Sequence, residues 1–290
     1  MFFYKNLRPA TESAYTKAVN QFKKAYPDIS IEEVTEMHIG KWQKEVLKKI
    51  KPVTWNNYIR HLSALYNFLI KREIITYNPF KHFSIREDNV PHKIFSEKML
   101  TQIENVLARK EHTLPTALQP IWFINSLVNL FKYTAIRRGQ LLKLTISDID
   151  LEQKLITIPS HINKNHTFHQ IPIPQKIYIQ VEKLVIEMKR NGQNSKSQLF
   201  NINVLSKTTT RKNKNMNDNQ LSYIFAIISQ LVNFKVSPHR FRHTLATKLM
   251  KDPQNVYVTK QLLGHKSLKT TLSYICYDPE SLRNILDTLK

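Results

Sequence analysis

Apolar residues recur three and four positions apart along most of this chain, a spacing that favours amphipathic helices over strands. In the first part the pattern covers residues 11–26, with Thr11 or Ser13 as N-cap, then residues 35–50, and resumes near residue 54. We expect four short helices that end near residue 77 and form a small bundle. Their predicted core residues are Tyr15, Val19, Phe22, Tyr26, Ile39, Trp42, Val46, Tyr58, Leu62, Leu65 or Tyr66, and Leu69.

The helical spacing lapses between residues 78 and 92. An Asn-Pro pair, a charged run and a further proline occur there, and such residues disfavour regular structure. We place a linker at residues 86–92, between a first domain of residues 1–85 and a second domain of residues 93–290. The length also suits two domains, because a domain averages roughly 150 residues.

The second part is again mostly helical. Ser96 is a predicted N-cap, two helices are expected between residues 118 and 144, and the second of them should span residues 133–144. Residues 221–289 return to helical spacing.

One hairpin interrupts these helices. Residues 154–158 and 170–173 have the pattern of short strands, and the polar residues 161–169 would form the tip of the hairpin. Residues 193–219, rich in Asn, Lys, Ser and Thr, predict an exposed loop. The predicted fold class is therefore mainly α, a four-helix bundle followed by an α-rich domain with a small β-hairpin.

Positive charge is spread over both parts of the chain. The 290 residues include 44 Lys+Arg and 22 Asp+Glu, a net charge of +22, with +6 on residues 1–90 and +16 on residues 91–290. Excess charge on two folded segments suits a clamp around a phosphate backbone better than a membrane tether. A protein with a merely basic surface remains the alternative.

Several other classes are excluded or disfavoured. The four glycines include no two within fifty residues of each other, so neither a G-x-G-x-x-G loop nor a Walker A loop exists. Cys276 is the only cysteine, which excludes an intrachain disulfide and a CxxC zinc site. The most apolar stretch, residues 121–131, is too short to span a bilayer, and the N-terminus does not resemble a signal peptide. We expect a cytoplasmic protein with no cofactor, no metal and no membrane partner.

Polar motifs follow one another in the second part. In the segment S-P-H-R-F-R-H, His239 and Arg242 are three positions apart, so on a helix they share a face and reach one anion. The segment L-L-G-H ends at His265, and Tyr274 follows nine residues later in K-T-T-L-S-Y. Upstream, Arg137 ends the segment Y-T-A-I-R. In order and spacing these residues resemble the tyrosine recombinase (phage integrase, Xer-like) family, over essentially the whole chain.

The resemblance carries the family's catalytic residues onto Arg137, Lys164, His239, Arg242, His265 and Tyr274. Lys164 stands at the hairpin tip, eight residues before Pro172, as the family's hairpin lysine commonly does. One position departs from the pattern, since Gln140 occupies the place where the family usually has Glu or Asp. This difference indicates that Arg137 is held in an altered way. The resemblance also makes the N-terminal bundle a SAM-like core-binding domain, and residues 93–290 the catalytic domain.

The resemblance further implies a metal- and ATP-independent DNA strand transesterase. Arg137 and Arg242 would stabilise the charge that gathers on the phosphate oxygens of the transition state. Tyr274 would attack phosphorus and form a 3′-phosphotyrosyl link, which stores the energy of the broken bond for rejoining.

Three further residues take acid–base and binding roles under this resemblance. A tyrosine phenol has a pKa near 10, so it needs a proton acceptor, for which His239 is the candidate. Lys164 would protonate the leaving 5′-oxygen, and His265 would hydrogen-bond the phosphate.

The implied partner is double-stranded DNA with inverted core sites, bound by a homotetramer in a synaptic complex, with accessory proteins in some systems. The protein would associate with the nucleoid when bound to DNA. The function is then site-specific recombination in integration, excision or resolution of a mobile element or replicon. Type IB topoisomerase-like relaxation and non-catalytic DNA binding remain alternatives.

Other residues near the motifs have alternative or supporting roles. Tyr257 and Tyr277 are the alternative nucleophiles, and we expect His161, His166 and His169 to face DNA rather than a metal. We expect supporting roles for Arg138 and His243, and turn positions for Asp148 and Asp150. After Tyr274, a short amphipathic run carries Leu282, Ile285, Leu286 and Leu289 on one face. This run would pack on its own domain or dock into a neighbouring subunit.

Overall fold

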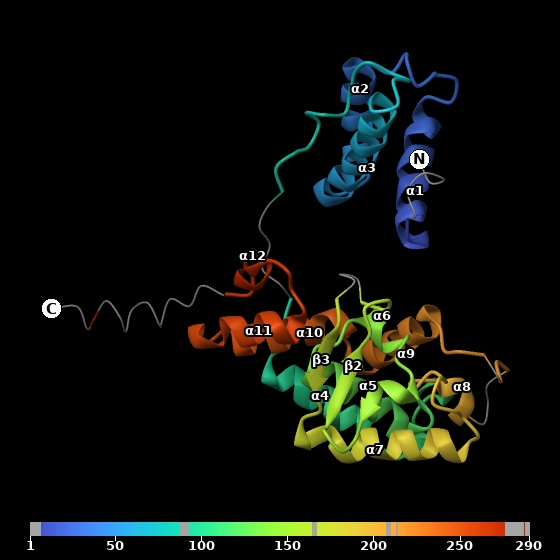
Figure 1. The fold of residues 1–290 in the computed structure, drawn as a ribbon, viewed down its shortest axis with the longest axis vertical. Helices are drawn as coiled ribbons and strands as arrows, with labels where there is room; N and C mark the ends of the chain where they lie inside the picture. Colours follow the sequence, from blue (N-terminus) through green and yellow to red (C-terminus); the bar gives the residue numbers. More distant parts are fainter. Residues whose placement is uncertain are drawn as a thin grey trace. The chain divides into compact units, whose positions relative to one another are not determined.

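The structure is a computed structural model that describes residues 7–87, 93–163, 167–206, 210–212, 214–275 and 287. The chain separates into two compact units, residues 1–90 and residues 91–290. Helices dominate the described part of both units, and the second also holds a small antiparallel sheet (Figure 1). The mainly α fold class predicted from the sequence is confirmed.

The first unit contains the helices α1 (Pro9–Ala25), α2 (Glu36–Leu47) and α3 (Pro52–Ile70). Proline opens both α1 and α3, where its missing N–H costs no helical hydrogen bond. The buried core of the unit joins side chains of all three helices with Val34 and Phe80 from outside them: Ala18, Phe22, Val34, Ile39, Trp42, Trp55, Tyr58, Ile59, Leu62, Tyr66 and Phe80.

The structure corrects the predicted four-helix count, because residues 7–87 form three α-helices. After α3 the chain turns at Glu73, whose φ is 58°, and Pro79 then disfavours helical geometry at the residue before it. The first helix begins at Pro9 instead of being capped by Thr11 or Ser13. Of the two alternatives left open in the third helix, Tyr66 is the buried one.

Part of the non-periodic segment that follows α3 belongs to this unit. Phe80 is fully buried, the Trp55 indole N–H donates to the Phe83 carbonyl at 2.7 Å, and Asn56 Nδ2 donates to the Ile85 carbonyl at 2.8 Å. Of the predicted linker, residues 86–92, only residues 86 and 87 are described.

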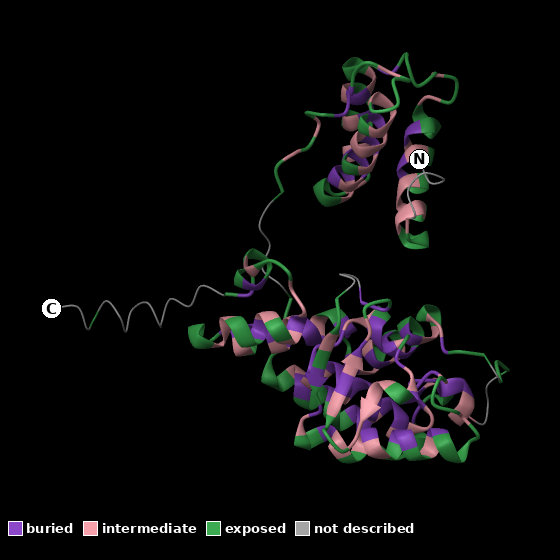
Figure 2. Cartoon of the chain, viewed as in Figure 1, coloured by how far each residue is buried: buried purple, intermediate pink, exposed green. Residues whose placement is uncertain are grey.

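The second unit is built around α5 (Ile121–Thr134), which packs against α7 (Gln175–Arg190) and α10 (Pro238–Leu249). Its other helices are α4 (Glu97–Leu107), α6 (Arg138–Leu141), α8 (Ile202–Leu205), α9 (Asp218–Val232), α11 (Val256–Leu263) and α12 (Leu268–Leu272). Ser96 caps α4 as predicted, since its side chain accepts a hydrogen bond from the Met99 N–H. The buried core of this unit joins residues of the helices with Ile156, Ile158 and Ile171 of the sheet, and buried positions are purple in Figure 2.

The sheet has the antiparallel order β1 (Ile149–Asp150), β2 (Leu155–Ile158) and β3 (His169–Pro172). The β2–β3 pair confirms the predicted hairpin strands, with Ile156 opposite Ile171 and Ile158 opposite His169. The sequence did not predict β1. Lys154 takes a left-handed φ of 54° in the turn before β2, so the strand starts one residue later than expected.

The helix predicted over residues 133–144 is wrong. Tyr133 belongs to α5, which ends at Thr134 because Ala135 adopts a left-handed φ of 51°. The chain then reverses before the short helix α6, and Arg137 stands at the N-cap of that helix.

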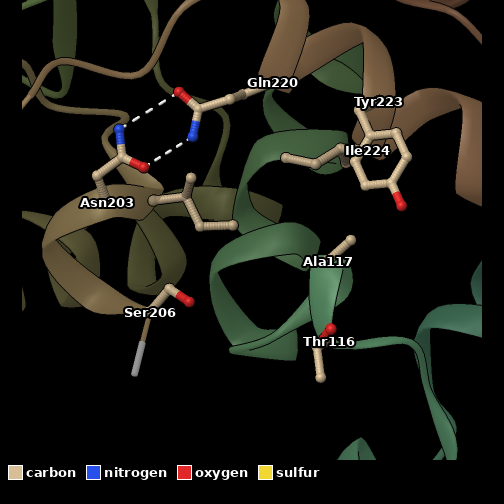
Figure 3. A pocket seen from close by; sticks show the side chains of 8 residues that line it. Thr116, Ala117, Asn203, Ser206, Gln220, Tyr223 and Ile224 are labelled. Carbon is tan, nitrogen blue, oxygen red and sulfur yellow. Dashed lines mark hydrogen bonds between the residues drawn. The ribbon is translucent and has the colours of Figure 1, made fainter. Parts of the chain in front are cut away.

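The exposed loop predicted over residues 193–219 is also wrong in part. Leu199 and Phe200 are buried, and α8 lies inside this segment. Polar side chains are accommodated because they bond to one another and to the backbone. Asn203 and Gln220 pair through both ends of their amides, at 2.7 and 3.3 Å, beside a surface pocket (Figure 3).

Across the described residues, no helix combines the length and apolar character that a bilayer span requires. The amphipathic run predicted after Tyr274 lies outside the described residues, apart from residue 287.

Candidate active site

Three parts of the second unit bring the predicted site residues together. They are the turn after α5, the face of α10 and the segment from the end of α11 through α12. Ser237 caps α10 by accepting from the Arg240 N–H, and Pro238 opens the helix. The helix therefore forms where the sequence predicted it, and the three-residue spacing sets His239 and Arg242 on one face.

Arg242 is the most enclosed charge in the site, with 6% of its surface exposed. Its Nη1 donates to the Ala135 carbonyl at 2.6 Å, and its Nη2 donates to the Leu263 carbonyl at 2.6 Å. Both carbonyls end helices, where unpaired C=O groups and the helix dipole favour a cation. Burial, followed by repulsion from Arg137, lowers the pKa of Arg242 to about 10, so the guanidinium stays protonated at neutral pH.

Arg137 lies beside Arg242 at the start of α6. Its Nη2 donates to the Gly264 carbonyl at 3.3 Å, and desolvation lowers the pKa of its guanidinium. None of the ion pairs among the described residues gives either arginine a carboxylate partner. The two positive charges are therefore available to an anion.

His265 lies between Arg242 and Thr271. Arg242 Nη2 is 3.3 Å from His265 Nε2, and His265 Nδ1 is 3.0 Å from Thr271 Oγ1. Because a guanidinium only donates, Nε2 must accept, which assigns the proton to Nδ1 and a donor role toward Thr271. Desolvation and both arginines lower the pKa of His265 to about 4, which agrees with a neutral ring.

Tyr274 follows α12 and is 94% buried among Ala135, Ala246, Met250 and Leu263. Its ring is nearly parallel to that of His265, with centroids 6.1 Å apart, and its hydroxyl hydrogen-bonds to Arg242.

The rival tyrosines are placed differently. Tyr257, on α11, is 69% exposed, and Tyr277 lies outside the described residues. Tyr274 therefore lies against Arg242 and His265, whereas Tyr257 is exposed on α11.

His239 is exposed on α10, and His243 lies one turn further along, with ring centroids 6.3 Å apart. The ring of His243 also lies 5.4 Å from that of Tyr274, tilted by 37°. Partial desolvation and the positive charge of Arg242 lower the pKa of His239. A neutral, exposed imidazole can accept a proton, as the predicted role requires.

Two predicted residues of the hairpin tip, Lys164 and His166, lie outside the described residues. His169 does not project from the tip, contrary to expectation. It lies in β3, half-buried, and its Nε2 is enclosed with no hydrogen-bond partner among the described residues. A methyl group added at Gly264 would stand 2.9 Å from His169 Nδ1, so the glycine admits this ring beside Arg137.

The supporting residues agree with their predicted structural roles. Arg138 pairs with Asp218 and donates to its carbonyl at 2.6 Å. Asp148 accepts from the Thr145 N–H and Asp150 from the Gln153 N–H, both at 2.8 Å, as turn residues do. Within the described ranges no three His, Cys, Asp or Glu side chains gather as metal ligands would.

Two family comparisons cover most of the chain. The phage integrase family matches residues 99–280, and the phage integrase N-terminal SAM-like domain matches residues 1–76. The chain belongs to the phage integrase family. Its tyrosine recombinase resemblance is thereby confirmed, and the matched region contains the arginines, histidines and tyrosine described above.

Among curated relatives of this integrase, a tyrosine recombinase XerC of Pseudomonas aeruginosa is 30% identical over 98% of the chain and 69% of the relative. A protein of the same name from Pseudomonas syringae is 29% identical over 97% of the chain and 61% of the relative. The chain thus spans about two thirds of the length of these relatives. The Tn1549 transposon integrase, solved with a circular intermediate DNA, covers 99% of the chain with a TM-score of 0.74 at 17% identity, which shows a shared fold.

Several residues that hold the site could not be recognised from the sequence motifs. Thr271 orients His265, Ala135 supplies a carbonyl to Arg242, and Asn163 contacts Gln140. Thr271 lies inside the K-T-T-L-S-Y motif, so its position was visible although its role was not. The left-handed conformation of Ala135 and the contact between Gln140 and Asn163 cannot be recognised from the neighbouring sequence.

Proposed function

We propose that this integrase is a site-specific DNA recombinase that cleaves and rejoins strands through a 3′-phosphotyrosyl intermediate. The observation that carries the proposal is a buried tyrosine, Tyr274, against two arginines that lack carboxylate partners in the described ion pairs. This arrangement suits attack on a phosphodiester, because the nucleophile lies beside the cations that would stabilise the developing negative charge.

In the proposed cleavage step, Tyr274 Oη bonds to phosphorus and the bond from phosphorus to the 5′-oxygen breaks. The phenol proton passes to His239, and Lys164 supplies a proton to the leaving 5′-oxygen, each role worth ~10²–10⁴ in rate. Arg137 and Arg242 stabilise the transition state through charge-assisted hydrogen bonds. Attack by a 5′-hydroxyl on the phosphotyrosyl link reverses these transfers and rejoins DNA without ATP.

His265 contributes through Arg242, because its Nε2 accepts from the guanidinium. Turning Nε2 toward a phosphate requires a protonated ring or the other tautomer, so binding of the phosphate would raise the pKa of His265. The proposed DNA substrate carries inverted core sites and is bound by a homotetramer, with residues 1–85 as core-binding domain and residues 93–290 as catalytic domain.

The proposal is tested first by covalent capture. Nicked duplexes from a randomised pool are incubated with the protein in EDTA, and DNA that stays attached in denaturing gels is sequenced. We expect one recurring inverted motif, attached through its 3′-phosphate. A supercoiled plasmid with two copies of that motif should then yield recombinant circles. Relaxed circles alone would favour topoisomerase-like activity, and the absence of any attached DNA would contradict strand cleavage.

A further inference from the structure

Thr271 contacts both His265 and Tyr274 from within α12. The residue is fully buried, and its Oγ1 lies 3.0 Å from His265 Nδ1. Its carbonyl oxygen accepts from the backbone N–H of Tyr274 at 3.1 Å. The rings of His265 and Tyr274 are nearly parallel, with 16° between their planes. One residue therefore links the position of this histidine to that of the candidate nucleophile.

His265 is held both by its backbone and by its ring nitrogens. Its backbone N–H donates to the Lys260 carbonyl at 3.0 Å, in the last turn of α11. Its Nε2 accepts from Arg242 Nη2 at 3.3 Å, and its Nδ1 donates to Thr271 Oγ1. Arg242 also hydrogen-bonds to the Tyr274 hydroxyl, which closes the series of contacts. Because these contacts restrain the imidazole, its protonation can change more easily than its orientation.

A hydroxyl group suits the position beside Nδ1 because it both donates and accepts hydrogen bonds. When Nε2 accepts from Arg242, Nδ1 carries the proton and the Thr271 hydroxyl accepts it. When Nε2 carries the only proton, Nδ1 must accept, and the hydroxyl can donate after rotating about the Cβ–Oγ1 bond. On a doubly protonated ring, Nδ1 donates and Oγ1 accepts again. The hydroxyl can thus pair with Nδ1 in both neutral tautomers and in the cation.

We propose that Thr271 is a positioning residue whose hydroxyl keeps His265 in one orientation while Nε2 changes from acceptor of Arg242 to donor toward the scissile phosphate. In this change one solvent proton adds to Nε2, and in the neutral form of the ring one proton also leaves Nδ1. Nδ1 faces a fully buried residue, so without the hydroxyl it would lose its partner on that side, which is costly for an enclosed polar atom. The inference rests on the proposed function, since it takes the phosphate as the ligand of His265.

The test measures how fast the protein attaches covalently to the captured nicked duplex in a single turnover. Valine has nearly the shape of threonine but no hydroxyl, and serine has the hydroxyl but no methyl group. For Thr271→Val we expect attachment ~10- to 100-fold slower than in the parent, because a misplaced donor forfeits part of the ~10²–10³ that such a donor contributes. Thr271→Ser should restore the rate to within ~3-fold of the parent, and both variants should bind the uncleaved duplex within ~3-fold of it, as expected when ground-state binding is unchanged.

Other variants make the result specific. Thr270→Val, at an exposed position of the same helix, is the matched control and should attach DNA like the parent. Thr271→Ala against Thr271→Ser repeats the comparison on a smaller side chain, in case Thr271→Val fails to fold. His265→Ala should be at least as slow as Thr271→Val, and the double variant no slower than His265→Ala, because the defects of two residues that act through one group do not add. Thermal unfolding confirms that each variant is folded.

The outcomes separate this inference from the proposed function. If Thr271→Val attaches DNA like the parent, or Thr271→Ser is as slow as Thr271→Val, the role of the hydroxyl is overturned. If the defects of Thr271→Val and His265→Ala multiply in the double variant, Thr271 acts independently of His265, and the positioning role is overturned. Both results would leave the recombinase chemistry standing. A parent protein that attaches to no DNA would overturn the proposed function itself.

Discussion

At the scale of single residues, the site keeps two cations close together without neutralising them. Arg242 and Arg137 bond to carbonyl oxygens of helix ends and turns, which hold a guanidinium while leaving its formal charge unpaired. Each guanidinium has five N–H groups, and these contacts use only part of them. The remaining donors suit a phosphate.

A first prediction concerns the tyrosine hydroxyl. Tyr274→Phe should bind the captured DNA within a few-fold of the parent, because the hydroxyl supplies the nucleophile and little of the phosphate contact. It should form no covalent adduct on denaturing gels. Tyr257→Phe is the matched control and should react like the parent, since that side chain is 69% exposed on α11. A residual covalent adduct in Tyr274→Phe would show that another residue is the nucleophile.

A second prediction concerns pH. In the folded protein the pKa of His265 is lowered from 6.5 to about 4, and the pKa values of His169 and His239 are lowered as well, by desolvation and by Arg137 and Arg242. The unfolded chain therefore binds protons first as the pH falls. The contribution of these histidines to the free energy of unfolding is therefore complete above pH 6.5 and is lost progressively as the pH falls toward 4.

Urea unfolding at pH 7 and pH 5.5 measures this effect before most carboxylates titrate. The midpoint should fall at pH 5.5, and His265→Asn should reduce the fall. His112→Asn, an exposed residue on the connection between α4 and α5, serves as control and should leave the fall unchanged. An equal fall in the parent and His265→Asn would mean that other groups account for the pH dependence.

At the scale of elements, the site depends on how two helices end. α5 ends at the left-handed Ala135, and α11 ends at the left-handed Gly264, whose φ is 59°. The chain reversals at these residues direct carbonyl oxygens toward the arginines. The catalytic geometry thus comes from helix termini as much as from the motif residues themselves.

A third prediction tests one of these termini. Gly264→Ala should destabilise the protein by more than ~1–2 kcal/mol, the usual cost of a left-handed L-residue, because the added methyl also meets His169 Nδ1 at 2.9 Å. Gly139→Ala is the control, since nothing lies within 4 Å of its added methyl. In the double variant Gly264→Ala with His169→Ala, part of the loss should return in thermal unfolding. No recovery would locate the whole cost in the backbone.

These elements also show what a sequence can predict here. The helix of His239 and Arg242 follows from Ser237, Pro238 and the apolar spacing, all of which are local. Alanine has a high helix propensity, so the sequence predicted one continuous helix through Ala135. In the structure Ala135 instead forms the left-handed turn that precedes Arg137.

Contacts between residues far apart in the chain could not be predicted from the sequence at all. The buried Gln140–Asn163 hydrogen bond forms only when the hairpin packs beside α6. Leu199 and Phe200 are buried, but the polar residues around them in the sequence predicted an exposed loop. Motif order predicted the candidate reacting residues, whereas tertiary packing determined which residues hold them in place.

At the scale of the whole molecule, the two units have separate hydrophobic cores. In the first unit it is formed by residues of α1, α2 and α3 with Val34 and Phe80; in the second it comprises a large cluster between Phe95 and Phe241 and a smaller one around Tyr274. Among the described residues these clusters have no member in common, so each unit has the packing of an independently folded domain. Both units also carry excess positive charge, +6 and +16. Two basic bodies on one chain bind a polyanion with an effective concentration set by their connection.

The last prediction follows from that connection. A protease site inserted between Val90 and Pro91 leaves the uncut protein with both units linked, and cutting it makes their binding to DNA independent. We expect the affinity for the captured duplex to fall by ~10²–10⁴ on cutting, the usual gain from linkage, while both cores keep their unfolding midpoints. The uncut insertion variant, in the same buffer, is the control. The dependence of affinity on salt should also become shallower for residues 91–290 alone, because fewer phosphates are neutralised. An unchanged affinity after cutting would mean that residues 1–90 contribute nothing to binding, and the +6 charge of that unit would then belong to an ordinary basic surface.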